Sequence, residues 1–302
     1  MKRKIAVVTV LLVLVVAGLL VWLAIRVERR VVGQYFDSKG VRIHFTDEGA
    51  GEPVILIHGF AANADLNWRV PGITQGLAED YRVIALDNRG HGLSDKPHDV
   101  DAYGMMMVDD VIRLMDHLKI EKAHIVGYSM GGFIALKFLT TYPERAICAA
   151  PCGAGWELPV DSGDFSDTLA GSLEENGDFS PLFTMLDPEG QGLGPVATWL
   201  SNRKLNAEND VLALAAAIRS LDAIAVPEEA LRANTVPTLT VVGTDDPLRA
   251  GVDRMTGVMS NHQVIHIEGA NHLTALGPEL LRHVKDFIAA HPATGEAIPD
   301  AA

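Results

Sequence analysis

The chain has 302 residues, 48% of them hydrophobic, and a formal net charge of −14. This length and hydrophobic content suit one large α/β domain, or at most two domains. A net charge of +5 in the first 30 residues leaves −19 for the remainder. Such an acidic body argues against nucleic acid as a partner, because phosphate binding needs clustered cations.

The first long feature of the chain is an uncharged apolar stretch at residues 5–25, with basic residues on both sides. At about 1.5 Å per helical residue, it is long enough to cross a hydrocarbon core of about 30 Å. The competing interpretation is a cleaved signal peptide, whose apolar region is usually shorter and is followed by a small-residue cleavage site. We therefore predict that residues 1–30 form a single-pass membrane anchor, with the rest of the chain outside the cytoplasm.

Strand-like and helix-like segments alternate along most of the remaining chain. Apolar runs and β-branched residues predict strands at residues 35–37, 41–46, 53–58, 81–86, 123–126, 145–150, 238–242 and 263–267. Helical patterns occupy residues 73–78, 109–118, 133–141 and 279–290. Strands that alternate with helices indicate a mostly parallel sheet with helices on both faces.

The middle of the chain, residues 152–232, has no strand run and contains a strongly helical stretch at 210–222. We interpret it as a helical lid inserted over the carboxyl end of the sheet. The predicted organisation is thus an N-terminal segment at 1–30, one α/β domain at 31–290 and a disordered tail at 291–302. The two cysteines, Cys148 and Cys152, do not make a disulfide framework, and no close cluster of ligand residues predicts a metal.

The strand predicted at 123–126 and the helix predicted at 133–141 enclose the sequence Gly-Tyr-Ser-Met-Gly, with Ser129 at its centre. A serine on such a tight strand-to-helix turn takes a strained backbone conformation, and Gly127 and Gly131 allow strand and helix to approach closely. The turn would present the Ser129 hydroxyl at the carboxyl end of the sheet, beside the amide of Met130. Ser129 is therefore the candidate nucleophile.

A serine nucleophile needs a base, and the base needs an acid that orients it. The candidate base is His272, which follows the last predicted strand, and the candidate acids are Asp245 and Asp246, which follow the preceding strand. A second oxyanion donor should come from the loop after an early strand. Gly59 lets that loop turn, so the Phe60 amide is expected to join the Met130 amide in holding a developing oxyanion.

Together these motifs resemble the serine hydrolases of the α/β-hydrolase fold, within the group of small esterases, lactonases and cofactor-free haloperoxidases. The similarity covers about residues 33–290. The motifs that carry it are His-Gly-Phe at 58–60, Asp-Asn-Arg-Gly-His-Gly-Leu-Ser-Asp at 87–95, Gly-Tyr-Ser-Met-Gly-Gly at 127–132, Gly-Thr-Asp-Asp-Pro at 243–247 and Gly-Ala-Asn-His at 269–272.

The resemblance implies a catalytic triad of Ser129, Asp246 and His272, because the family spacing from Gly243 selects Asp246 as the acid. It implies no cofactor and gives His91 an architectural role. One departure from the family pattern is Asn271, where glycine is usual. Relatives that use aspartate as the nucleophile, the haloalkane dehalogenases and epoxide hydrolases, are excluded by the serine.

The predicted function is hydrolysis of a small-molecule carboxylic ester or lactone through an acyl-enzyme intermediate. Two alternatives stay open: a membrane-tethered, non-catalytic binding protein on the same fold, and peracid or haloperoxidase chemistry with the same triad. Large apolar lid residues would either line a pocket for the substrate or form the lid's own core. They are Trp156, Phe165, Phe179, Phe183, Leu186 and Trp199.

Overall fold

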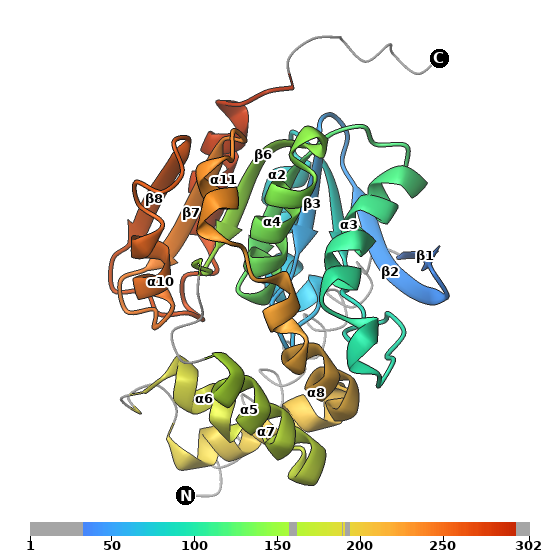
Figure 1. Ribbon diagram of the computed structural model, residues 1–302, viewed down its shortest axis with the longest axis vertical. Helices are drawn as coiled ribbons and strands as arrows, with labels where there is room; N and C mark the ends of the chain where they lie inside the picture. Colours follow the sequence, from blue (N-terminus) through green and yellow to red (C-terminus); the bar gives the residue numbers. More distant parts are fainter. Residues whose placement is uncertain (1–32, 157–161, 189, 191–193, 294–302) are drawn as a thin grey trace, which may run out of the picture. The chain divides into compact units, whose positions relative to one another are not determined.

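The computed structural model describes residues 33–156, 162–188, 190 and 194–293, and those from Gln34 onward belong to one compact unit. Its centre is an eight-stranded sheet of order β1-β2-β4-β3-β5-β6-β7-β8 (Figure 1). The strands are β1 (Gln34–Ser38), β2 (Val41–Glu48), β3 (Pro53–Ile57), β4 (Arg82–Leu86), β5 (Ala123–Tyr128), β6 (Ala146–Cys152), β7 (Thr238–Gly243) and β8 (His262–Ile267). β2 pairs antiparallel with β1 and β4, and all other pairs are parallel. The prediction of a mostly parallel sheet is thus confirmed.

Helices cover both faces of the sheet, which explains why its central strands are continuous apolar runs. On one face, Ile55 and Ile125 pack in a hydrophobic cluster with α3 (Met105–His117) and α4 (Met130–Thr141). On the other face, the adjacent residues Leu56 and Val126 pack with α2 (Ile73–Ala78) and α11 (Pro278–Ala289). Successive strand residues point to opposite faces, so these strands need an apolar residue at every position.

A group of helices between β6 and β7 stands apart from those that cover the sheet (Figure 1). It comprises α5 (Ser162–Asn176), α6 (Ser180–Leu186), α7 (Pro195–Glu208), α8 (Val211–Arg219), η4 (Leu221–Ile224) and α9 (Glu228–Arg232). α5 and α8 pack against each other through Leu169, Leu173 and Leu214, which are fully buried. Among the described residues between β6 and β7, none forms a strand. This helical group is called the lid below.

Four shorter helices of the described chain lie in the segments that connect the strands and the longer helices. They are the π-helix η1 (Asp65–Arg69), the 3-10 helices η2 (Val100–Ala102) and η3 (Pro143–Arg145), and the α-helix α10 (Arg249–Arg254).

The prediction of a single-pass membrane protein requires correction. No helix in the part of the chain that the structure describes is long and apolar enough to cross a membrane. The stretch at residues 5–25 that carried this prediction lies outside the described residues, as does most of the predicted tail, residues 294–302. Membrane anchoring and an extracytoplasmic location are therefore not retained.

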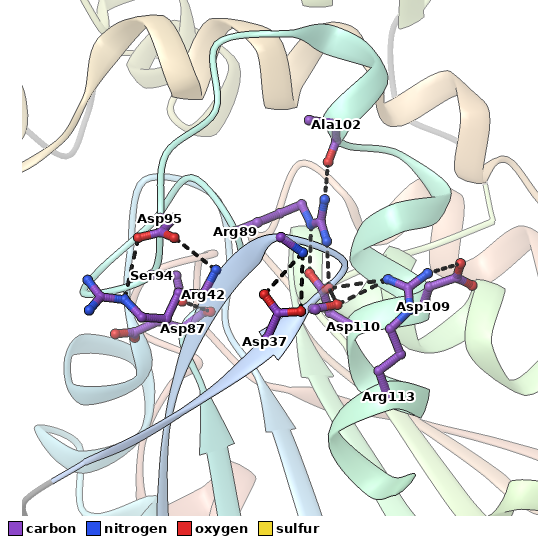
Figure 2. A network of polar contacts seen from close by, with 12 residues as sticks. Asp37, Arg42, Asp87, Arg89, Ser94, Asp95, Ala102, Asp109, Asp110 and Arg113 are labelled. Atoms are coloured by element: carbon purple, nitrogen blue, oxygen red, sulfur yellow. Dashed lines mark hydrogen bonds and ion pairs between the residues drawn. The ribbon is translucent and has the colours of Figure 1, made fainter. Parts of the chain in front are cut away.

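A buried ion pair holds the loop after β4 against the helix α3 (Figure 2). The Arg89 guanidinium donates to both carboxylate oxygens of Asp110, at 2.7 and 2.6 Å, and to the Ala102 carbonyl. The Ser38 hydroxyl donates to the same carboxylate at 2.5 Å. Because both charged side chains are almost fully buried, these hydrogen bonds replace the water that each charge lost on folding. The motif at residues 87–95 is fixed to α3 in this way.

Candidate active site

Ser129 lies at the tight turn between β5 and α4, in a strained backbone conformation with φ 55° and ψ −121°. Two glycines make this turn possible. A Cβ on Gly127 would lie 2.0 Å from the Gly131 carbonyl oxygen, and a Cβ on Gly131 would lie 2.0 Å from the Ile57 carbonyl oxygen. The Ser129 amide donates to the Cys152 carbonyl at 3.0 Å. The turn is thus held by its neighbours in a geometry that a serine alone would not adopt.

His272 and Asp246 meet because the loops after β7 and β8 are pressed together. A Cβ on Gly243 would lie 2.0 Å from the Ala270 carbonyl oxygen, and the Asp245 amide donates to that same carbonyl at 3.0 Å. This contact brings His272 Nδ1 to 2.8 Å from Asp246 Oδ2. Both residues are only 4% exposed, so the pair is shielded from water.

Further hydrogen bonds fix the orientation of both side chains. The Leu248 amide donates to Asp246 Oδ1 at 2.9 Å, which leaves Oδ2 to face the imidazole. The Tyr128 hydroxyl donates to the His272 carbonyl at 2.5 Å, and the two rings lie 5.2 Å apart. Asp245 is exposed and takes a hydrogen bond from its neighbour Thr244 at 3.2 Å. Of the two candidate acids, Asp246 is therefore the one that meets His272.

The loop after β3 brings Gly59 and Phe60 to the same place. A Cβ on Gly59 would lie 3.1 Å from the Ser129 Cβ, a tight contact that would push the loop and the serine apart by a few tenths of an ångström. The Gly59 amide donates to Asn67 Oδ1 at 2.7 Å, which fixes the turn. Within the described part of the chain, neither the Phe60 amide nor the Met130 amide donates to a protein acceptor. Both amides are therefore available to a ligand.

His58 supports this loop from inside the protein. Its Nε2 accepts from the Asn88 amide at 2.9 Å, so the proton must sit on Nδ1, which donates to the Gly59 carbonyl at 2.8 Å. Burial lowers the pKa of His58, which keeps the ring neutral and this tautomer in place. His91 packs edge-on to His58, with ring centres 5.2 Å apart, and it is fully buried. Neither histidine lines the cavity described next.

A cavity of about 1160 Å³ connects these groups with the lid. Ser129, His272, Phe60 and Met130 all contribute to its wall, together with residues of α5, α6, α7 and α8. The lid therefore covers the carboxyl ends of the strands, where the candidate nucleophile and base lie. The proposed nucleophile, the proposed base and the two residues with free loop amides therefore share one cavity.

The large apolar lid residues divide into two groups. Phe165, Phe183 and Leu186 line the cavity, as the pocket interpretation requires. The other three do not line it: Phe179 is fully buried in the lid core, Trp199 is 60% exposed on α7, and the Trp156 indole donates to the Val226 carbonyl. The pocket interpretation thus fits Phe165, Phe183 and Leu186, the core interpretation fits Phe179, and exposed Trp199 fits neither.

Three residues that position the site carry no signal in the sequence. Asn67 lies on the π-helix η1, where its role depends on a fold that no motif announces. Leu248 acts through its backbone amide, which any residue except proline would supply. Tyr128 stands inside the serine motif, but its hydrogen bond to the His272 carbonyl joins positions 144 residues apart.

Among the residues that the structure describes, neither the cysteines nor a group of possible metal ligands forms a second reactive site. Burial raises the pKa of the Cys148 and Cys152 thiols to about 12, so both stay protonated and unreactive at neutral pH. Both are free thiols. Over the ranges that the structure describes, no group of three or more His, Cys, Asp or Glu side chains could hold a metal ion.

Comparison with known proteins places the chain in a family. The profile of the alpha/beta hydrolase fold family matches residues 52–177. The "Putative non-heme chloroperoxidase" of Synechocystis sp. is 30% identical over 264 residues, which cover 80% of this chain and 91% of that protein. This chain therefore belongs to the α/β-hydrolase fold family.

Other relatives are similar over shorter regions or in fold alone. The 2-hydroxymuconate semialdehyde hydrolase of Pseudomonas sp. (strain CF600) is 37% identical over 135 residues, which cover 44% of this chain and 47% of that enzyme. This chain thus spans about half of that enzyme's length, and less of two other relatives. The thermophilic esterase of Thermogutta terrifontis has the same fold, with a TM-score of 0.72 at 24% identity, over 87% of this chain and all of the esterase chain.

Proposed function

We propose that this protein is a serine hydrolase that cleaves a carboxylic ester or lactone through an acyl-enzyme intermediate. The observation that carries the proposal is the shared cavity. Strained Ser129 and His272 both line it, and His272 Nδ1 lies 2.8 Å from Asp246 Oδ2. These three side chains are the proposed triad, and Phe60 and Met130 supply the proposed oxyanion donors.

In the proposed mechanism, Ser129 Oγ attacks the ester carbonyl carbon while His272 Nε2 takes the serine proton. The carbonyl oxygen gains negative charge and is held by the amides of Phe60 and Met130. His272 then returns the proton to the leaving alcohol, which departs and leaves an acyl-serine. Water, deprotonated by the same imidazole, attacks the acyl group and releases the acid. Asp246 holds the imidazole in the tautomer that can accept a proton at Nε2 and stabilises the imidazolium.

Hydrolysis of short p-nitrophenyl esters by the full-length protein tests this proposal. Wild-type protein should release p-nitrophenol, and Ser129→Ala should lose that activity. Equal activity of the two proteins would overturn the assignment of Ser129. A non-catalytic binding protein on this fold would show no activity in either form, and the complete set of proposed catalytic groups argues against it.

Peracid chemistry is a second candidate, favoured by the relative named as a non-heme chloroperoxidase, most of whose length this chain covers. It would use the same proposed triad, with hydrogen peroxide in place of water as the acceptor of the acyl group. Adding hydrogen peroxide, acetate and bromide and following bromination of an organic dye would distinguish it, because the peracid formed would oxidise bromide to the brominating agent and return acetate. A rate of halogenation that depends on Ser129 would favour this alternative over simple hydrolysis.

A further inference from the structure

The wall of the cavity contains no lysine or arginine within the described part of the chain. Its charged residues are the acids Asp187, Asp245 and Asp246, and much of the remaining wall is apolar. Residues 157–161, 189 and 191–193, whose placement is not described, contain three acids and no lysine or arginine. The lid therefore offers no cation to pair with a negatively charged group on a substrate.

The cations of the lid have other partners or face elsewhere. Arg219 pairs with Glu174 at 2.9 Å, and the exposed Arg232 pairs with Glu228 four residues earlier. The Arg203 guanidinium lies over the ring of Trp199, 5.9 Å from its centre, on exposed α7. The fourth, Lys204, is exposed on α7, and none of the four contributes to the wall of the cavity.

The net charge of the chain segment that contains the lid also disfavours anionic substrates. Residues 152–232 contain 14 Asp or Glu and 4 Lys or Arg, a net charge of −10 out of −14 for the whole chain. A negative potential of this kind lowers the local concentration of anions and favours neutral or positively charged molecules. Asp245, exposed at the cavity wall beside the proposed triad, is the described acid best placed to exclude an anionic substituent.

We propose that the cavity accepts uncharged esters or lactones with apolar substituents and excludes substrates that carry a second, free carboxylate. This inference rests on the proposed function, because it names the substrate class of that same site. An unpaired carboxylate that enters the cavity loses water without gaining a cation, a cost that is large for any buried unpaired charge. Substrates that are themselves carboxylates, such as the compound named in the 2-hydroxymuconate semialdehyde hydrolase relative, would therefore be excluded.

The test compares two substrates that differ only in this charge: methyl 4-nitrophenyl adipate, which is neutral, and mono-4-nitrophenyl adipate, which is an anion at pH 7.5. Both release the same chromophore from the same acyl chain. With the full-length protein, kcat/KM for the anionic ester should be lower than kcat/KM for the neutral ester by a factor of at least about 100, as expected for an unpaired buried charge. The loss should shrink as salt is added, because part of it is long-range repulsion.

A variant that lacks the charge of Asp245 tests whether this residue contributes to the selectivity against the anionic ester. Asp245→Asn should lower the ratio of kcat/KM for the neutral over the anionic substrate about fivefold, the effect of one nearby charge in a watery environment. Glu144→Gln removes an equal charge from an exposed position in η3, outside the cavity wall, and should leave the ratio unchanged. A purely structural role of Asp245 would alter both substrates alike and would not move the ratio.

The outcomes separate this inference from the proposed function. Equal turnover of both substrates, or preference for the anion, would refute the inference and leave the serine hydrolase proposal standing. A failure to hydrolyse either substrate, with Ser129 unreactive toward a fluorophosphonate, would refute the proposed function and the inference with it. An unchanged ratio in Asp245→Asn would refute the role of Asp245.

Discussion

Replacing Asp246 by asparagine exchanges one carboxylate oxygen for an NH₂ group, and the structure allows us to work out the consequence. The Leu248 amide donates to Asp246 Oδ1 at 2.9 Å, so the amide oxygen of the asparagine would keep that position. Its NH₂ group would then face His272 Nδ1, at present 2.8 Å from Oδ2. An NH₂ group donates, so His272 would have to accept at Nδ1 and carry its proton on Nε2. In that tautomer the imidazole cannot take the proton of Ser129.

The size of the loss in turnover distinguishes the wrong-tautomer explanation from the loss of a single hydrogen bond. Loss of one hydrogen bond to a charged group costs about 1.5–3 kcal/mol, or about 10- to 150-fold in rate. The wrong tautomer lowers turnover by about 10⁴-fold in a serine protease, which corresponds to about 5.4 kcal/mol. We expect the larger loss for Asp246→Asn, because the Leu248 amide prevents the asparagine from turning over to restore the acceptor.

The assay is turnover of p-nitrophenyl butyrate by wild type and Asp246→Asn, with thermal unfolding measured to show that both are folded. Asp245→Asn, which removes the same charge from the adjacent position, should retain far more turnover. A loss of only about 10- to 100-fold in Asp246→Asn would mean that the tautomer argument is wrong. A greater loss in Asp245→Asn than in Asp246→Asn would make Asp245 the acid.

Three further predictions concern stability. Gly131→Ala should destabilise the protein in urea unfolding, because the new Cβ would lie 2.0 Å from the Ile57 carbonyl oxygen. The control is Gly171→Ala, whose new Cβ has no atom within 4 Å and which should stabilise helix α5 by about 0.5–1 kcal/mol. Arg89→Met should cost about 3 kcal/mol in thermal unfolding, because the buried Asp110 carboxylate would lose both guanidinium hydrogen bonds and keep the Ser38 hydroxyl and the Arg113 guanidinium, which is 3.7 Å away (Figure 2). Arg42→Met, at an exposed ion pair, should cost at most about 1 kcal/mol, and equal losses would contradict this. Burial lowers the pKa of His91 to about 3, so the unfolded chain binds more protons than the folded one between about pH 3 and 6.5. The free energy of unfolding should therefore fall as pH drops below 6.5, by about 1.4 kcal/mol per unit from this residue, and His91→Phe should show a shallower slope.

The central strands β3, β5 and β7 could be predicted from the sequence because each is buried on both faces and therefore reads as an apolar run. The edge strands β1 and β8 are partly exposed and mix polar with apolar residues. The β-strand β3 (Pro53–Ile57) and the helix α2 (Ile73–Ala78) fall within a residue of their predicted bounds. In the lid, only α8 was predicted as a separate helix, since Val211–Arg219 is apolar at most positions. α5 and α7 mix small, polar and apolar residues, so their packing against neighbours decides their bounds.

For the candidate site, the sequence located the serine turn and the histidine because each stands at the end of an apolar strand. It could not place Asn67, whose side chain reaches Gly59 only through the turn of η1. It also could not divide the large lid residues between cavity and core, since Phe179 and Phe183 are four residues apart and only Phe183 lines the cavity. Such distinctions depend on how α6 is rotated against its neighbours.

Labelling with a fluorophosphonate, read by intact-protein and peptide mass spectrometry, tests the proposed catalytic serine most directly. The reagent reacts with a serine only when a neighbouring base activates it, so it reports the chemistry without a known substrate. We predict one adduct per chain, on the peptide that contains Ser129, and none in Ser129→Ala. The rate of labelling should fall sharply in His272→Ala. Absence of an adduct in the folded wild-type protein, or an adduct on another serine, would contradict the assignment of Ser129 as the nucleophile.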